Sequence, residues 1–318
     1  MRKSLAALIF ILAAGPGLRA QAPLPPLDDR ALRPAGVTIA GVELEPIPAG
    51  VFLMGSPLDE PGRGPFEGPR SRVIISRPFW LGRTDVTHAQ WKAVMGTDLM
   101  EQARRAFPND SQFAQSLAGT GDNVPMYYVS WDDAMAFCRK LNERARAEGS
   151  LPDGYIYTLP TEAQWEYACR AGITAATYAG PLQLLGKNNA PVLDAIAWYG
   201  GNSSAGYLGP GLDTRDWPEK AYPGGTAGPR EVALKQPNGW GLYDMLGDVY
   251  QWCRDFPADA LAGGTVTDPA GLARGADRAV RGGSWHSDAA FCRAAYRARN
   301  VPVNRSLFIG FRVALAPR

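Results

Sequence analysis

The sequence predicts an α+β protein that is rich in ordered loops and has little regular secondary structure. First, glycine and proline, 36 and 27 of the 318 residues, are too frequent for long helices or strands. Second, nine Trp, twelve Tyr and eleven Phe are interleaved with them, so the loops can be buried and ordered. Third, short stretches with helical spacing and short alternating stretches both occur. The length allows one large domain or two, and 46% hydrophobic residues supply a core.

The N-terminal segment, residues 1–22, is predicted to be a secretory signal peptide. Met1–Lys3 gives a positive start, residues 5–14 are apolar but too short to span a bilayer, and Ala20–Ala22 offers a small-x-small cleavage site. No cysteine follows that could carry a lipid anchor, and no later segment is apolar enough to cross a membrane. We therefore expect an exported protein, periplasmic or secreted, whose mature form has no transmembrane segment.

The charge pattern argues against a nucleic-acid partner. The formal net charge is only +2, and acids and bases are scattered along the chain without a basic run that could follow a phosphate backbone. The sequence leaves the oligomeric state open.

After the signal peptide, residues 23–36 are typical of a Pro-rich extended linker, and the domain is expected to cover residues 37–318. Val42 and Leu44 alternate with acidic residues as in a half-buried strand, with which Phe52–Met54 could pair. Further short strands are expected at residues 71–76, 78–83, 279–285 and 309–314.

Three helices are predicted from their N-cap residues and stop signals. The secondary structure of residues 97–123, which are polar, cannot be assigned from the sequence. Residues 173–235 are loop-like, and a connection this long usually carries function. The expected helices run from the N-cap Thr87 to Met95, from Ser130, with a capping box to Asp133, through Leu141, and from Thr161, with a capping box to Gln164, to the stop at Gly172.

Because an exported protein folds in an oxidising compartment, we expect the four cysteines to form two disulfides. The sequence alone leaves three connectivities open. We prefer Cys138 with Cys169, each on the apolar stripe of a predicted helix, together with Cys253 with Cys292.

Residues 236–253 are the stretch around which the chain is organised. Three glycines and a proline exclude a regular helix, while the apolar residues between them need burial, so a compact loop ending in a short strand is expected. Asp244 and Gln251 bracket Gly247 and Val249, and side-chain oxygens beside backbone carbonyls are the ligands that calcium prefers. Alternatively, Asp244 and Asp248 only brace turns, which the local sequence alone favours.

Four segments together resemble the signatures of the formylglycine-generating enzyme, or sulfatase-modifying factor, family. The similarity runs from about Pro46 to Ala316 and implies a single asymmetric domain with a C-type-lectin-like fold. The segments are Tyr157–Gly172 (containing Thr-Glu-Ala-Gln-Trp-Glu), Pro237–Trp252 (containing Asn-Gly-Trp-Gly-Leu-Tyr), Val280–Trp285 (Val-Arg-Gly-Gly-Ser-Trp) and Gly310–Arg312 (Gly-Phe-Arg).

The resemblance also implies calcium, which reverses the preference drawn from the local sequence. The family's second calcium site falls on Asp244, Gln251 and the backbone oxygens of Gly247 and Val249. A first site would use Asn202 and the Ser203 carbonyl, with further ligands unassigned.

The family's copper(I) site is not retained in this sequence. In the ungapped register its two cysteines fall on Ser287 and Cys292, and a serine hydroxyl cannot replace a thiolate on a soft copper(I) ion. The segment around Cys292 further resembles bacterial relatives that pair this cysteine with the position of Cys253. Copper is therefore not expected, and this pairing together with Cys138–Cys169 would leave no free thiol.

His286, Ser287 and Cys292 remain the candidate catalytic residues. His286 and Asp288 flank Ser287, but adjacent residues on an extended chain point in alternating directions, so we expect a polar lining of a cleft rather than a catalytic triad. The candidate substrate cleft comprises Trp285, Asp288, Arg297 and Arg299. For the arginines, buried ion pairs that tie loops together are the preferred alternative, and for Glu162 the preferred alternative is helix capping.

Three functions follow from these observations. The first is an exported oxidative enzyme that modifies a peptide, protein or siderophore-type small molecule without the copper-binding cysteine pair. The second is a non-catalytic, calcium-stabilised lectin-like binding module. The third is formylglycine generation that uses Cys292.

Overall fold

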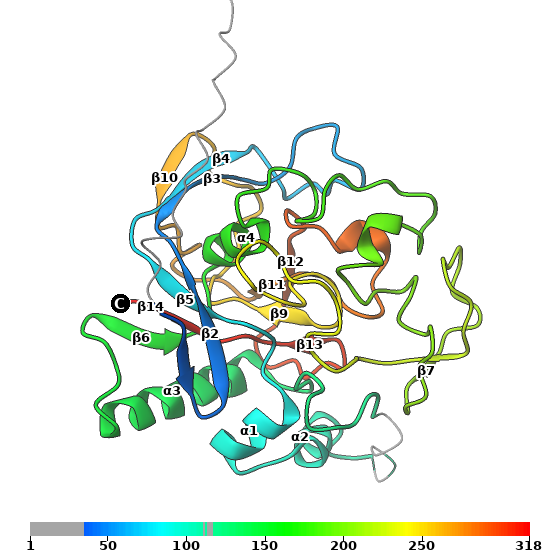
Figure 1. Ribbon diagram of the computed structural model, residues 1–318, viewed down its shortest axis with the longest axis horizontal. Coiled ribbons are helices and arrows are strands. Elements are labelled where there is room, and N and C mark those ends of the chain that lie inside the picture. Colours follow the sequence, from blue (N-terminus) through cyan, green and yellow to red (C-terminus); the bar gives the residue numbers. More distant parts are fainter. Residues whose placement is uncertain (1–34, 111, 113–116) are drawn as a thin grey trace, which may run out of the picture. The chain divides into compact units, whose positions relative to one another are not determined.

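The largest sheet of the computed structural model has the C-terminal strand inside it (Figure 1). The structure describes residues 35–110, 112 and 117–318, so the predicted signal peptide and most of the predicted linker lie outside it. The sheet has the order β1-β2-β5-β14-β6, and all neighbours are antiparallel. Its strands are β1 (Val37–Ile39), β2 (Val42–Ile47), β5 (Phe79–Gly82), β14 (Ala314–Pro317) and β6 (Tyr155–Thr158).

Three smaller sheets complete the β-structure of the described residues. A three-stranded sheet has the order β10-β4-β3, a four-stranded sheet the order β12-β11-β9-β13, and β7 pairs with β8. Two pairs, β10 with β4 and β13 with β9, are parallel. The strands are β3 (Gly50–Met54), β4 (Ser71–Ile75), β7 (Leu212–Asp213), β8 (Thr226–Ala227), β9 (Tyr250–Trp252), β10 (Thr265–Thr267), β11 (Arg278–Arg281), β12 (Ala298–Asn300) and β13 (Ile309–Gly310).

The helices begin at the predicted N-cap residues. Thr87, Ser130 and Thr161 each accept a hydrogen bond from the third helical amide and complete a capping box. One further helix follows Asp98, inside the stretch that the sequence left ambiguous. The helices are α1 (His88–Met95), α2 (Leu99–Ala106), α3 (Trp131–Ala147) and α4 (Glu162–Arg170), with short 3₁₀ turns η2 (Pro191–Leu193) and η3 (Ala289–Phe291). None of the described helices is both long and apolar enough to cross a membrane.

Two strand predictions were wrong in detail. Phe52–Met54 pairs with β4 and not with the strand at Val42, because an alternating pattern fixes which face is buried but not which strand is the neighbour. The expected strand 309–314 is two strands, β13 and β14. The residues between them, Phe311–Val313, carry the chain from the four-stranded to the five-stranded sheet.

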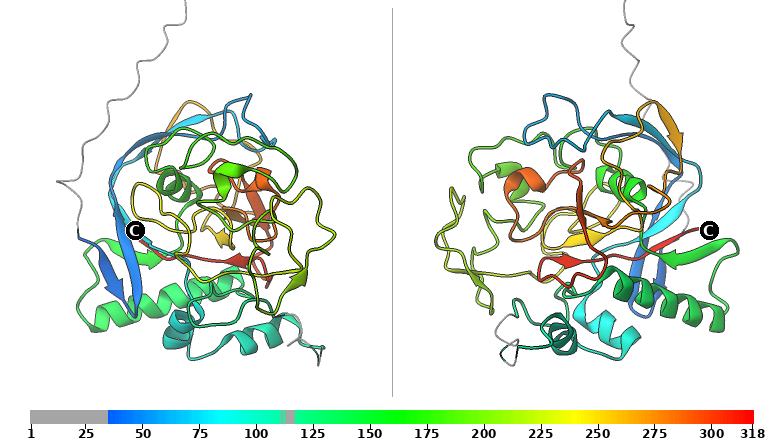
Figure 2. Two further views of the ribbon diagram at one scale, coloured as in Figure 1. Left: turned by 45° about the vertical axis from the view of Figure 1, so that its right-hand side comes forward. Right: turned by 180° about the vertical axis from the view of Figure 1, so that it is seen from behind.

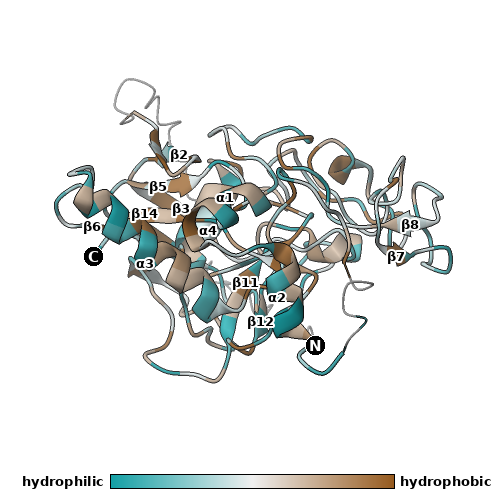
Figure 3. Ribbon diagram, turned by 90° about the horizontal axis from the view of Figure 1, so that it is seen from below, coloured by the Kyte–Doolittle hydropathy of each residue, from teal (hydrophilic) through white to brown (hydrophobic). Residues whose placement is uncertain are grey.

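The interior consists of two hydrophobic clusters. One surrounds Trp91, Phe137 and Phe311, where α1 and α3 pack together, and the other surrounds Trp165 and Met245. Figure 3 shows polar and apolar residues alternating along α3, as expected for a helix with one buried face. The connection from α4 to β9 contains only η2, β7 and β8 as regular structure, which agrees with the predicted loop, and its part around β7 lies on the side of the domain away from the five-stranded sheet (Figure 2).

Candidate functional site

A tight turn after β11 brings the candidate catalytic segment into the interior. Gly282 and Gly283 have φ of 100° and 80°, a backbone region that favours glycine. A Cβ atom on Gly283 would lie 2.6 Å from Cys292 Sγ. Glycine is therefore needed where the chain passes over the cysteine.

Ser287 is held in a cluster of hydroxyl groups. Its Oγ accepts a hydrogen bond from the Ser284 amide at 2.9 Å, lies 3.1 Å from Ser284 Oγ, and donates to the Tyr250 hydroxyl at 3.3 Å. Burial raises the pKa of Tyr250 well above its usual value, so the phenol stays protonated at neutral pH. The cluster thus contains neutral hydroxyl groups and supplies no general base to Ser287.

His286 and Asp288 do not form a catalytic triad with Ser287. The His286 ring packs against Trp217 and Phe308, with ring centroids 4.7 Å apart in both cases. Burial among these rings lowers the pKa of His286, and Asp288 only partly opposes this effect. The Asp288 carboxylate lies 3.5 Å from the Lys187 ammonium. The three adjacent residues therefore have different partners, as the alternating geometry predicted.

All four cysteines are free, buried thiols, and neither expected disulfide is present. Cys138 belongs to one hydrophobic cluster and Cys169 to the other, which explains why these two do not meet. Cys253 Sγ contacts the Gln251 carbonyl, whereas Cys292 lies under Gly283. Burial raises the pKa of Cys292 to about 12, so its sulfur is a thiol and not a nucleophilic thiolate at neutral pH.

At the expected second calcium site, the Gln251 side-chain oxygen is already used by other groups of the protein. Gln251 Oε1 accepts hydrogen bonds from Trp165 Nε1 at 2.6 Å and from Arg312 Nε at 2.8 Å. The Asp244 carboxylate accepts one from the Ala233 amide at 2.7 Å. Gly247 and Val249 lie in the expected turn between these residues. The Gln251 oxygen is thus already bound within the protein, and the set lacks this ligand for calcium.

The expected first site is used in a similar way. Asn202 Oδ1 accepts a hydrogen bond from the Tyr199 amide at 3.0 Å, and the Ser203 carbonyl accepts one from Arg230 Nη2 at 2.8 Å. In the described part of the chain, no three His, Cys, Asp or Glu side chains are grouped as a metal ion would require.

The arginines expected at the substrate cleft bind elsewhere in the protein. Arg297 forms two hydrogen bonds to Glu162, and Arg299 pairs with Asp259. The other buried arginines also bridge loops: Arg281 binds Glu166, and Arg293 binds Glu60 and Glu67. The expected buried ion pairs are therefore confirmed for Arg293 and Arg297, whereas the Arg299 pair is exposed and Glu162 binds Arg297.

A pocket of about 350 Å³ lies beside the Ser287 segment. Trp217 forms one wall and stacks on Trp285, with ring centroids 6.2 Å apart. Lys220 forms another wall, with its ammonium group 5.8 Å from the centre of the Trp217 ring. The pocket is completed by Arg215, Pro223, Gly224 and Gly225. An aromatic ring and a cation therefore lie side by side in the wall of this pocket.

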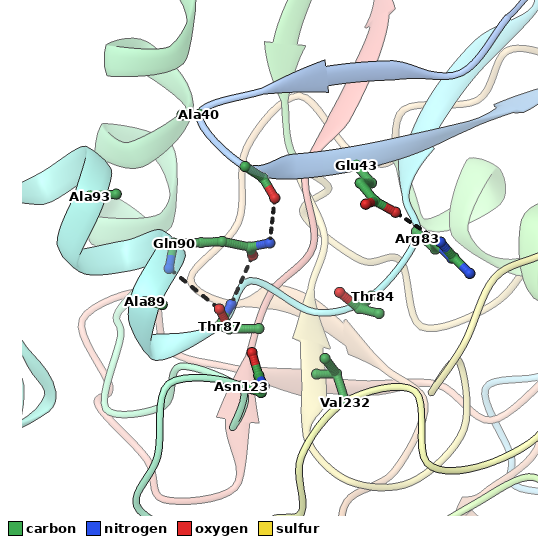
Figure 4. Close-up of a pocket in the computed structure, with 11 residues that line it drawn as sticks. Ala40, Glu43, Arg83, Thr84, Thr87, Ala89, Gln90, Ala93, Asn123 and Val232 are labelled. Carbon is green, nitrogen blue, oxygen red and sulfur yellow. Dashed lines mark hydrogen bonds and ion pairs between the residues drawn. The ribbon is translucent and has the colours of Figure 1, made fainter.

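A larger pocket, of about 460 Å³, lies between the β1–β2 turn and the start of α1 (Figure 4). Its polar side chains are paired: Gln90 donates to the Gly41 carbonyl at 2.9 Å, and Arg83 binds Glu43 at 2.8 Å. None of the candidate site residues lines it. We therefore place the candidate site at the Trp217 pocket.

The sequence analysis did not single out Trp217, Tyr250 or Phe308. Trp217 lies in the long loop whose length had indicated function, so a search for aromatic residues in that loop would have found it. Tyr250 precedes the conspicuous pair Gln251-Trp252, and nothing local distinguishes it.

The sequence model of the sulfatase-modifying factor enzyme 1-like domain matches residues 41–317. The chain belongs to this family. It is 30% identical to the formylglycine-generating enzyme of Streptomyces coelicolor over 309 residues, which cover 84% of this chain and 87% of that enzyme. The mouse formylglycine-generating enzyme is 27% identical over 317 residues, 87% of this chain and 76% of the mouse protein.

Solved structures agree with this assignment. Treponema denticola variable protein 1 superposes with a TM-score of 0.65 at 27% identity, over 89% of this chain and 99% of its own. The sulfatase-modifying factor family and the α+β, C-type-lectin-like fold expected from the sequence are therefore confirmed.

Proposed function

We propose that this chain is a binding member of the sulfatase-modifying factor family, which recognises a peptide segment of an extracytoplasmic protein at the Trp217 pocket. The observation that carries the proposal is the state of the two positions where the family has its copper-binding cysteines. Ser287 is a neutral hydroxyl held by Ser284 and Tyr250, and Cys292 is a buried thiol with a raised pKa. Neither position therefore provides the thiolate that would bind copper(I).

The pocket beside this segment supports a binding role. A half-buried indole ring next to a cation suits aromatic and acidic side chains of a peptide. Lys220 donates to Thr214 Oγ1 at 2.7 Å and to the Gly224 carbonyl at 3.1 Å, which fixes the pocket wall beside Trp217. The extracytoplasmic location of the partner rests on the predicted signal peptide.

The second candidate is oxidative modification without the copper-cysteine pair. Membership of a family of modifying enzymes, along almost the whole domain, favours it. It needs an electron acceptor that the side chains around Ser287 do not supply.

A peptide assay separates the candidates. The protein is incubated with a Cys-x-Pro-x-Arg peptide, copper(I) and oxygen, beside the Streptomyces coelicolor enzyme as a positive control. We expect no oxygen uptake and no peptide aldehyde by mass spectrometry. Aldehyde formation would instead establish formylglycine generation through Cys292.

Binding is measured on a peptide array that spans acidic and aromatic sequences. Hits should be lost in Trp217→Ala and kept in Trp80→Ala, a half-buried tryptophan on β5 outside the pocket. Hits that survive Trp217→Ala would contradict the proposed site.

A further inference from the structure

The orientation of the Gln251 amide is fixed by its neighbours. Trp165 Nε1 and Arg312 Nε carry hydrogens and can only donate, so the atom that both contact must be the amide oxygen. The amide nitrogen of Gln251 consequently points the other way. It donates to the Asp244 carbonyl at 2.8 Å and to Asp85 Oδ2 at 3.3 Å.

This orientation places a donor where a metal ion would need an acceptor. A hard cation in this turn would have to be bound by the Asp244 and Gln251 oxygens together. Instead, a second positive group is already present. Arg312 Nη2 donates to the Tyr243 and Asp244 carbonyls at 2.9 and 3.1 Å, and lies 3.7 Å from the Asp85 carboxylate.

The guanidinium of Arg312 has no access to solvent, and backbone carbonyls accept its hydrogen bonds. Its side chain and that of Asp85 are both completely buried. Arg312 Nη1 also donates to the Gly82 carbonyl at 2.8 Å, which ties β5 to the turn. One cation therefore binds carbonyl oxygens from two segments and lies beside the buried Asp85 side chain.

The same arrangement occurs independently at Ser203. Arg230 Nη2 donates to the Ser203 and Ala205 carbonyls, both at 2.8 Å or less, and its guanidinium lies 4.5 Å from the Trp198 ring centre. The Arg230 amide donates to Asp248 Oδ1 at 2.9 Å. The backbone oxygen that a cation would take is again bound by a guanidinium.

We infer that Arg312 and Arg230 hold these two turns in place of metal ions, so that the fold of this chain is independent of calcium. At the turn between Asp244 and Gln251, Gln251 is the residue that prevents metal binding, because its amide presents nitrogen and not oxygen to the Asp244 carbonyl. This inference does not depend on the proposed binding function.

The test compares unfolding temperatures in millimolar calcium and in EDTA. For the wild-type protein we expect a difference of less than about 1 °C, since any ligand that binds only the folded state raises the unfolding temperature by mass action. Isothermal titration with calcium should give no saturable heat. A calcium-dependent rise in the wild-type unfolding temperature would overturn the inference.

Gln251→Glu replaces the amide nitrogen by a second carboxylate oxygen, and we expect it to gain a calcium-dependent rise of several degrees. The matched control is Gln236→Glu on the exposed start of the same loop, which should gain none. A folded Gln251→Glu without a calcium response would overturn the role given to Gln251.

Arg230→Gln provides a readout that does not depend on the folding of the Gln251 variant. It should lower the unfolding temperature equally in calcium and in EDTA, because the lost interaction is the guanidinium. Restoration by calcium would show that the turn is a metal site and would overturn the inference.

Discussion

Arg297 and Glu162 form a bidentate ion pair, with Nε to Oε1 and Nη2 to Oε2 distances of 2.7 Å each. Burial alone would raise the pKa of Glu162, but the hydrogen bonds and charge of Arg297 hold it below its usual value. The pair joins the start of α4 to the segment that follows the candidate site. The function of Arg297 is therefore to fix this junction.

Arg297→Met is expected to lower the free energy of unfolding by about 3–5 kcal/mol, because it leaves a buried carboxylate without its partner. Urea denaturation measures the loss. Arg299→Met is the control: its partner Asp259 is 82% exposed, so we expect a loss within about 1 kcal/mol. Equal losses in the two variants would contradict a special role for the buried pair.

Gly247→Ala is expected to be far more damaging than Gly149→Ala. Both glycines have positive φ, 77° and 66°, so each alanine has a conformational cost of about 1–2 kcal/mol. Only at Gly247 would the new Cβ meet a backbone atom, the Trp198 carbonyl oxygen, at 2.2 Å, while Gly149 has open space. Thermal unfolding of both variants should show the difference, and similar unfolding temperatures would argue against the close approach.

Asp85→Asn should change how stability depends on pH. Burial, with the charge of Asp244, raises the pKa of Asp85 to about 8, against an opposing effect of Arg312 and Gln251. Between the unfolded value of 3.8 and about 8 the folded state holds a proton that the unfolded state has released, so wild-type stability falls as pH rises.

The asparagine has no proton to lose. The stability of the Asp85→Asn variant relative to the wild type should therefore increase from pH 4 to pH 8, as measured by urea unfolding at several pH values. A constant difference over this range would show that Asp85 is ionised throughout.

Trp217→Ala should raise the pKa of His286 toward its usual value of 6.5, because it removes one of the rings that shield the imidazole from water. NMR titration of the histidine ring protons measures this shift. His88 is an internal control, since burial beside Tyr127 lowers its pKa to about 4 and Trp217 takes no part. An unchanged pKa of His286 would show that the Trp217 ring does not shield the imidazole from water.

The thiol state of the cysteines can be counted directly. We expect four alkylated cysteines by mass spectrometry when the protein is unfolded under non-reducing conditions with iodoacetamide, and slow labelling of the folded protein. Two or four missing alkyl groups would show that the disulfides expected from the sequence form in the isolated protein.

Local chemistry made the helices predictable. Each N-cap side chain accepts a hydrogen bond from the backbone amide three residues later, so a few neighbouring residues are enough to predict where a helix begins. The N-cap residues are Thr87, Ser130 and Thr161. The ordered motifs made the family and fold predictable as well. The strand partner of Phe52–Met54 was not predictable, because pairing depends on segments far away in the chain.

The candidate site was only partly predictable. The sequence placed Ser287 and Cys292 at the relevant segment, but not that Ser287 would bind Tyr250, which lies 37 residues away. The oxygens of Asp244 and Gln251 suggested a cation, whereas the competing donor, Arg312, comes from a segment 61 residues beyond Gln251. The residue types show which oxygens could bind a cation, and only the fold shows which of these oxygens already accept hydrogen bonds from the protein.

The central place of β14 has a consequence for biosynthesis. Because residues 314–317 join β5 to β6, the largest sheet cannot close until residue 317 has left the ribosome. Pairing between segments so distant in sequence is slow to nucleate. Until β14 has been synthesised, β6 therefore has no neighbour in this sheet.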